Sequence, residues 1–132
     1  MGIVVGYLAT DEGRAALEAG AVEALQRGVR LVVIASARAS ADDAKRAELE
    51  EELARVGAEL DARGVEHELR LVAAGKDVAE DLIAAAVETD AALIVIGLRR
   101  RSPVGKLILG SNAQRILLDS PCPVLAVKPV RA

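Results

Sequence analysis

The segment Ala92-Leu-Ile-Val-Ile-Gly97 carries the clearest fold signal in this sequence of 132 residues. Five consecutive apolar residues are typical of a strand that is buried on both faces of a parallel sheet. Similar runs occur at residues 3–7, 31–35, 69–73 and 124–127. Stretches of helical periodicity separate these runs, so five strands are predicted to alternate with four helices. We therefore expect a doubly wound, open α/β domain with a parallel sheet.

The first two helical stretches carry start and stop signals. The first is expected to begin at Thr10 or Asp11 and to stop at Gly28, and the second to begin at Ser40 and stop near Gly64. Helical spacing turns one set of apolar side chains inward in each stretch: Leu17, Ala21, Ala24 and Leu25 in the first, and Leu49, Leu53, Val56 and Leu60 in the second.

The third helix is predicted over residues 77–88, and the fourth opens at Ser111. Ser111 and Gln114 have the spacing of a capping box, and Pro121 prevents the fourth helix from continuing. In the third helix the side chains predicted to face inward are Val78, Leu82, Ile83, Ala86 and Val87.

Charge and composition narrow the classes of function. The chain has 17 Lys and Arg against 20 Asp and Glu, a net charge of −3, which argues against a dedicated nucleic-acid binder. Tyr7 is the only aromatic residue, so bases would find no aromatic platform on which to stack. No apolar run approaches the roughly 20 residues of a membrane span, and the first residues carry no basic leader. We expect a cytoplasmic protein without nucleic-acid or membrane partners.

Cys122 and His67 are each the single residue of their kind. Cys122 lies between two prolines without metal-ligand spacing, so we expect it to fill a small apolar gap. His67 lies between Glu66 and Glu68, where the sequence allows either an exposed structural role or a role in proton transfer. We predict no catalytic triad and no metal site.

The segment from Gly97 to Gly110 is rich in glycine and basic residues and ends where the fourth helix begins. In an open parallel sheet, ligands bind beyond the carboxyl ends of the strands where the winding reverses, here expected between the first and fourth strands. Gly110 would let a phosphate approach main-chain N–H groups, and the basic side chains Arg99, Arg100, Arg101 and Lys106 would add charge-assisted contacts. The same residues also suit turns, a capped helix and a solvated surface, so both interpretations remain open.

Three other sites are not supported. A Walker-type phosphate loop would need glycine and a hydroxyl residue at the positions of Arg100 and Leu107, and no G-x-G-x-x-G motif follows the first strand. A phosphoacceptor receiver domain would need an acid where Tyr7 and Leu8 end the first strand. Asp11 is expected to cap a helix instead.

The spacing of Gly97, Arg100 and Gly110-Ser111 resembles the phosphate signature of the universal stress protein family, which is G-x-x-G, nine residues, then G-[ST]. Three of the four signature positions match, and Arg100 replaces the second glycine. The flanking segments also resemble the family: Ala92-Leu-Ile-Val-Ile-Gly97, Ser120-Pro-Cys-Pro-Val-Leu-Ala-Val-Lys128, Ile3-Val-Val-Gly-Tyr7 and Arg14-Ala-Ala-Leu17. Residues 1–132 are identified as a single domain of this family.

The resemblance implies an adenine nucleotide alpha-hydrolase-like, Rossmann-like fold with the strand order 3-2-1-4-5. It implies a site for ATP or AMP, with Mg²⁺ accompanying only ATP. The implied phosphate-side residues are Gly97, Arg99, Arg100, Gly110, Ser111 and Asn112, and the adenosine-side residues are Leu8 and Ser36. It also implies a homodimer formed through the last strand, at Val124, Leu125, Ala126 and Val127.

Two departures from the family pattern bear on ligand binding. Leu8 occupies the place of an Asp that contacts adenosine in nucleotide-binding members, and a Leu cannot accept a hydrogen bond. Arg100 adds a side chain where glycine is expected, although its guanidinium could grip a phosphate. We expect a dimeric stress-response regulatory domain with a degenerate phosphate loop, binding nucleotide weakly, or alternatively a homodimeric interaction module without nucleotide. At most we expect slow ATP hydrolysis or self-phosphorylation, and an adenylate-using enzyme is the least favoured reading.

Overall fold

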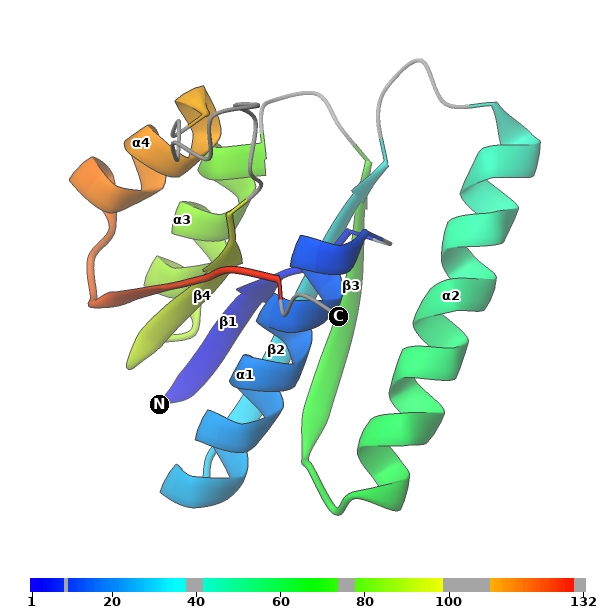
Figure 1. Cartoon of the computed structure of the whole chain (residues 1–132), viewed down its shortest axis with the longest axis horizontal. Coiled ribbons are helices and arrows are strands. Elements are labelled where there is room, and N and C mark those ends of the chain that lie inside the picture. Colours follow the sequence, from blue (N-terminus) through cyan, green and yellow to red (C-terminus); the bar gives the residue numbers. More distant parts are fainter. Residues whose placement is uncertain (9, 38–41, 74–77, 99–109, 130–132) are drawn as a thin grey trace.

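The sheet has five parallel strands in the order β3-β2-β1-β4-β5, as predicted (Figure 1). The computed structural model describes residues 1–8, 10–37, 42–73, 78–98 and 110–129. Along the chain the elements are β1 (Gly2–Gly6), α1 (Asp11–Arg27), β2 (Arg30–Ala37), α2 (Asp43–Ala62), β3 (His67–Ala73), α3 (Val78–Glu88), β4 (Leu93–Gly97), α4 (Ser111–Asp119) and β5 (Val124–Val127).

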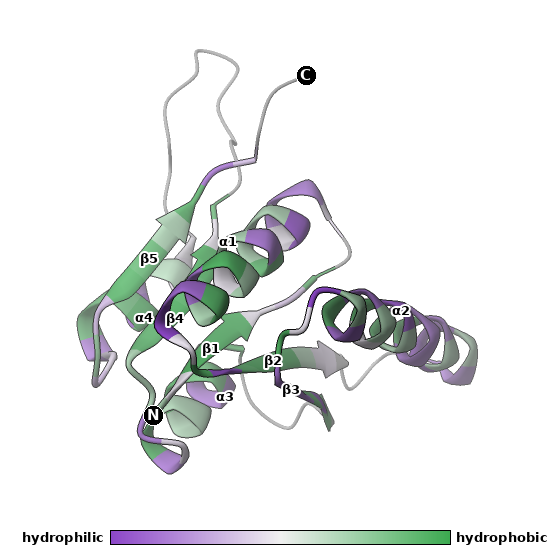
Figure 2. Ribbon diagram, turned by 90° about the horizontal axis from the view of Figure 1, so that it is seen from below, coloured by the Kyte–Doolittle hydropathy of each residue, from purple (hydrophilic) through white to green (hydrophobic). Residues whose placement is uncertain are grey.

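Alternating side chains of the central strands supply two separate apolar cores. Ile3 and Val5 of β1 pack into a cluster with α1 and α2, whereas Val4 packs into a cluster with α3 and α4. Figure 2 shows α1 and α3 on opposite sides of the green, apolar strands. The uninterrupted apolar runs are therefore explained, because both faces of β1, β2 and β4 are covered.

The ends of α1 agree with the prediction, and the start of α2 differs from it. The Thr10 hydroxyl accepts the Gly13 N–H at 3.1 Å, and Gly28 ends α1 with a φ of 65°. Helix α2 begins at Asp43 rather than Ser40, because the Asp42 carboxylate caps it by accepting the Lys45 N–H at 2.8 Å. Ser40 itself lies outside the described residues.

The predicted capping box at the start of α4 is wrong. Gly110 takes the N-cap position in an extended conformation, and Ser111 is already the first helical residue. Among the described residues, the N–H groups of the first turn therefore receive no cap from the N-cap side chain, which distinguishes α4 from α1 and α2.

Three predicted side-chain positions also need correction. Leu25 and Val87 are 46% and 64% exposed, because the buried face of α1 consists of Ala and Gly and that of α3 consists of Ala and Leu82. His67 is not exposed: its side chain turns beneath α2, leaving 14% accessible, with Nδ1 3.0 Å from the Val65 carbonyl oxygen. Cys122 packs, partly buried, against the core beneath α3 and α4.

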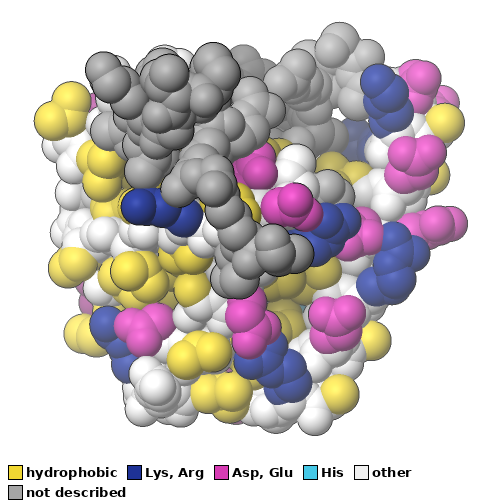
Figure 3. Space-filling model, viewed as in Figure 1, with side chains coloured by type: hydrophobic (Ala, Val, Ile, Leu, Met, Phe, Trp, Pro, Cys, Tyr) yellow, Lys and Arg dark blue, Asp and Glu magenta, His cyan; other side chains and the backbone are white. Residues whose placement is uncertain are grey.

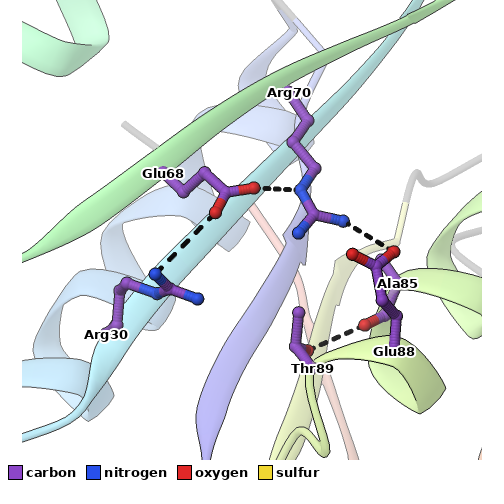
Figure 4. A network of polar contacts seen from close by, with 6 residues as sticks. All are labelled: Arg30, Glu68, Arg70, Ala85, Glu88 and Thr89. Carbon is purple, nitrogen blue, oxygen red and sulfur yellow. Dashed lines mark hydrogen bonds and ion pairs between the residues drawn. The ribbon is translucent and has the colours of Figure 1, made fainter.

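A polar network covers β3, the strand at one edge of the sheet (Figure 4). Glu68 lies between Arg30, at 3.8 Å, and Arg70, which also reaches Glu88 of α3 at 3.1 Å. Arg70 holds the pKa of the Glu68 carboxyl below its usual value. Charged side chains on an edge strand oppose pairing with another chain, so this edge is protected.

No helix in the described part of the chain is long and apolar enough to cross a membrane.

Candidate functional site

A cavity of about 150 Å³ lies at the carboxyl ends of β1 and β4, where the winding of the sheet reverses. This is the position at which open α/β sheets hold their ligands. Its described lining residues come from every part of the fold around that point: Gly6, Tyr7 and Leu8 after β1; Glu12 and Gly13 of α1; Ile34 and Ser36 of β2; Val78 and Leu82 of α3; Ile96 and Gly97 of β4; and Asn112, Ala113 and Ile116 of α4.

Glycines let α1 approach the ends of β1 and β4 very closely. A Cβ atom on Gly13 would lie 1.9 Å from the Leu8 carbonyl oxygen, and one on Gly97 would lie 2.2 Å from the Glu12 carbonyl oxygen. A Cβ on Gly6 would meet the Leu82 side chain at 2.9 Å. Gly97 was predicted as a phosphate-loop residue, and the structure shows a packing reason for its glycine as well.

The cavity has the size and polarity to enclose one ring system. An engineered apolar cavity of about 150 Å³ binds benzene, whereas whole drug-sized ligands need about 300–1,000 Å³. Most lining side chains are apolar, and the polar ones are Glu12, Ser36 and Asn112 together with the hydroxyl-bearing Tyr7. A larger ligand would place one ring inside and extend past the cavity.

Helix α4 borders the cavity with its first turn. Asn112 and Ala113 line the cavity, while Gly110 and Ser111 precede them at the start of the helix. Uncapped N–H groups and the positive end of the helix dipole favour an anion at such a place. A phosphate attached to an enclosed ring would therefore meet a favourable helix end.

The structure brings together part of the predicted site. Leu8, Ser36, Gly97 and Asn112 all line the cavity, and Leu8 remains 50% exposed. Arg99 and Arg100, like the other basic residues of the loop, lie outside the described residues.

Sequence reasoning missed two carboxylates at this site. Glu12 lines the cavity from the first turn of α1, and Asp81 of α3 accepts a hydrogen bond of 3.2 Å from the Ser36 hydroxyl. A usable signal existed for Glu12, because a helix that follows a strand directs its first turn toward the strand end. Asp81 lies 45 residues after Ser36, so only the fold reveals that contact.

Tyr7 lines the cavity and also belongs to the apolar core that the sheet forms with α1 and α2. Its hydroxyl donates a hydrogen bond of 2.7 Å to Glu52 of α2, and Glu52 also pairs with Arg55. Burial, and then the bond to Glu52, raises the pKa of Tyr7 to about 12. Glu18 of α1 and Arg63 at the end of α2 border the same surface hollow as Tyr7 and Glu52, and they pair at 2.7 Å. Figure 3 shows that acidic and basic side chains intermingle on this face of the molecule. Among the described residues, no group of three acidic, His or Cys side chains is arranged to hold a metal.

Comparisons with known proteins place the chain in a family. The model of the universal stress protein family matches residues 1–128. A universal stress protein of Mycolicibacterium smegmatis is 49% identical over 127 residues, covering 96% of this chain and 97% of the relative. A universal stress protein structure from Archaeoglobus fulgidus superposes with a TM-score of 0.84 at 37% identity, covering 97% of this chain and 98% of that one.

A second structure from Archaeoglobus fulgidus, described as the universal stress protein in complex with dAMP, superposes with a TM-score of 0.79 at 31% identity. It covers 97% of this chain and 98% of that one. Since the family model spans nearly the whole chain and a relative of almost equal length is half identical, this chain belongs to the universal stress protein family.

Proposed function

We propose that this chain is a cytoplasmic stress-response regulatory domain that binds an adenine nucleotide of the ATP or AMP type. The adenine ring occupies the cavity at the ends of β1 and β4, and the phosphates lie at the start of α4. The observation that carries the proposal is this ring-sized cavity bordered by a helix start without a side-chain cap. The relative of known structure with bound dAMP supports the same class of ligand.

Binding is expected to be weak, because Leu8 offers no hydrogen-bond acceptor at the mouth of the cavity. An unpaired donor on the ligand costs on the order of 1–3 kcal/mol, which corresponds to about a tenfold to hundredfold loss of affinity. Mg²⁺ would accompany ATP only. Glu12 is the one carboxylate among the described lining residues, so we propose at most slow ATP hydrolysis or self-phosphorylation.

The domain is proposed to work as a homodimer joined through β5. This strand pairs only with β4 in the described sheet, and Leu125 on it is 37% exposed. A second copy of the strand would satisfy its free main-chain groups and cover the apolar side chain. If no nucleotide binds, this surface leaves a second candidate function, a homodimeric interaction module.

The test is direct measurement of nucleotide binding. Mass spectrometry of gently denatured protein detects a nucleotide that co-purifies, and calorimetric titration with ATP, AMP and cyclic AMP ranks the ligands. Gly110→Val is the matched variant: its φ of −70° suits any residue, so the new side chain obstructs the helix start without straining the backbone. We expect binding in the native protein and its loss in this variant. Absence of binding at millimolar nucleotide would leave the interaction module as the function.

A further inference from the structure

The β2 side of the cavity carries one hydroxyl group, that of Ser36, among the described lining residues. Ser36 and Ile34 both line the cavity from β2, opposite Val78 and Leu82 of α3. The register explains their shared direction, because Ile34 and Ser36 are two residues apart on one strand. Of the described residues that line the cavity from β2 and α3, only Ser36 has a polar side chain that can form a hydrogen bond with a ligand.

Asp81 fixes the direction in which that hydroxyl points. The Ser36 Oγ donates to Asp81 Oδ2 at 3.2 Å, and both side chains are partly buried. An ionised carboxylate only accepts hydrogen bonds, so the single hydroxyl proton of Ser36 is committed to Asp81. The first turn of α3 favours the negative charge, because Asp81 lies near the positive end of that helix. The Ser36 oxygen consequently offers only lone pairs to a ligand in the cavity.

We infer that Ser36, oriented by Asp81, selects which ring enters the cavity: it accepts a hydrogen bond from a ring amino group and disfavours a ring carbonyl in the same place. This inference rests on the proposed nucleotide function and adds the basis of its specificity. A carbonyl oxygen facing the Ser36 lone pairs would lose its hydrogen bond to water without gaining another. Adenine carries the required amino group, whereas hypoxanthine carries a carbonyl at that position.

Three nucleotides that differ only in the ring provide the test. AMP has the amino group, IMP has a carbonyl in its place, and purine riboside 5′-monophosphate has neither. Calorimetric titration of the native protein should show AMP binding about tenfold tighter than either of the others. In Ser36→Ala, the three affinities should converge to within about threefold.

Asp81→Asn tests directly whether Asp81 orients the Ser36 hydroxyl. The new amide can donate to the Ser36 oxygen, which frees the hydroxyl proton to meet a ring carbonyl. We expect the ratio of AMP to IMP affinity to fall about tenfold in this variant. The matched control is Asp90→Asn, which removes the same charge at an exposed turn; Asp90 has a φ of 51°, a conformation that Asn tolerates well. The control should retain the native ratio, and thermal melting establishes that each variant is folded.

The outcomes separate the two proposals. Tight AMP binding with an AMP to IMP ratio that Ser36→Ala and Asp81→Asn leave unchanged overturns this inference and leaves the nucleotide function standing. Native protein that binds none of the three nucleotides overturns both. A ratio that falls equally in the Asp90→Asn control also overturns the inference, because overall charge would then explain the change.

Discussion

Replacing Gly97 with Ala tests whether packing, rather than a ligand, requires glycine at the end of β4. The added Cβ would lie 2.2 Å from the Glu12 carbonyl oxygen, against at least 3.4 Å for an ordinary contact, so α1 and β4 must separate by about 1.2 Å. The atom in the way is main chain and cannot rotate aside. Overpacking of this kind lowers the free energy of unfolding by about 1–3 kcal/mol. The lower conformational entropy of the unfolded variant offsets about 0.4–1 kcal/mol of that loss. Because the obstructing atom belongs to the main chain, we take the upper end of that cost and expect a net loss of about 2 kcal/mol.

Urea denaturation without any nucleotide measures this loss, and the melting temperature should fall by roughly 5–10 °C. Gly20→Ala is the matched control, because its Cβ would meet only the Leu31 and Val5 side chains, at 3.2 and 3.5 Å. The gain in helix propensity should offset the cost of that crowding, so the free energy of unfolding of Gly20→Ala should stay within about 0.5 kcal/mol of the native value. The reasoning is refuted if Gly97→Ala is as stable as the native protein and loses only nucleotide affinity.

Three further substitutions address the ligand, the dimer and the Tyr7 bond. Leu8→Asp supplies an acceptor at an exposed position of the cavity mouth and should tighten AMP binding about tenfold in calorimetry; no gain would contradict the placement of the ligand. Leu125→Asp should convert a dimer into a folded monomer in sedimentation at micromolar concentration, and a native monomer would contradict the β5 interface. Tyr7 has its pKa raised to about 12, so its contribution to stability is complete below about pH 10 and is lost as pH rises through 12. The native advantage over Tyr7→Phe should therefore shrink across that window in urea titrations, and an advantage independent of pH would exclude the effect.

The strands and their parallel pairing were predictable because β1, β2 and β4 are buried on both faces, whereas the order of the strands followed only from the family resemblance. A strand that is buried on both faces needs apolar side chains at consecutive positions, and these are visible in the sequence. The helix-length connections between the strands indicate parallel pairing. The caps of α1 were also predictable, since Thr10 and Gly28 act through local chemistry that depends on few neighbours.

Side-chain partners were harder to predict, since they depend on how elements meet. In α1 the face that contacts the sheet is built from Gly20 and Ala21, so the larger Leu25 was wrongly assigned to the core. Helix α4 begins at Ser111 as predicted, but the capping role of Ser111 was wrongly predicted, because Gly110 takes the N-cap position and Ser111 is already helical. The cavity lies at the strand ends where the sequence predicted a site, while Glu12 and Asp81 emerged only from the packing of helices on the sheet.

The cavity is a consequence of the packing that brings α1 onto the sheet. Gly13 and Gly97 have no side chains, so the first turn of α1 lies directly against the ends of β1 and β4. Gly6, Gly13 and Gly97 also line the cavity, beside residues of α3 and α4. A side chain added at Gly13 or Gly97 would meet main-chain atoms, so it would push α1 away from the strand ends and change the shape of the cavity. Stability and ligand capacity are thus coupled at these glycines, whereas Leu8 and Ser36 can change ligand preference without disturbing the contact that forms the cavity.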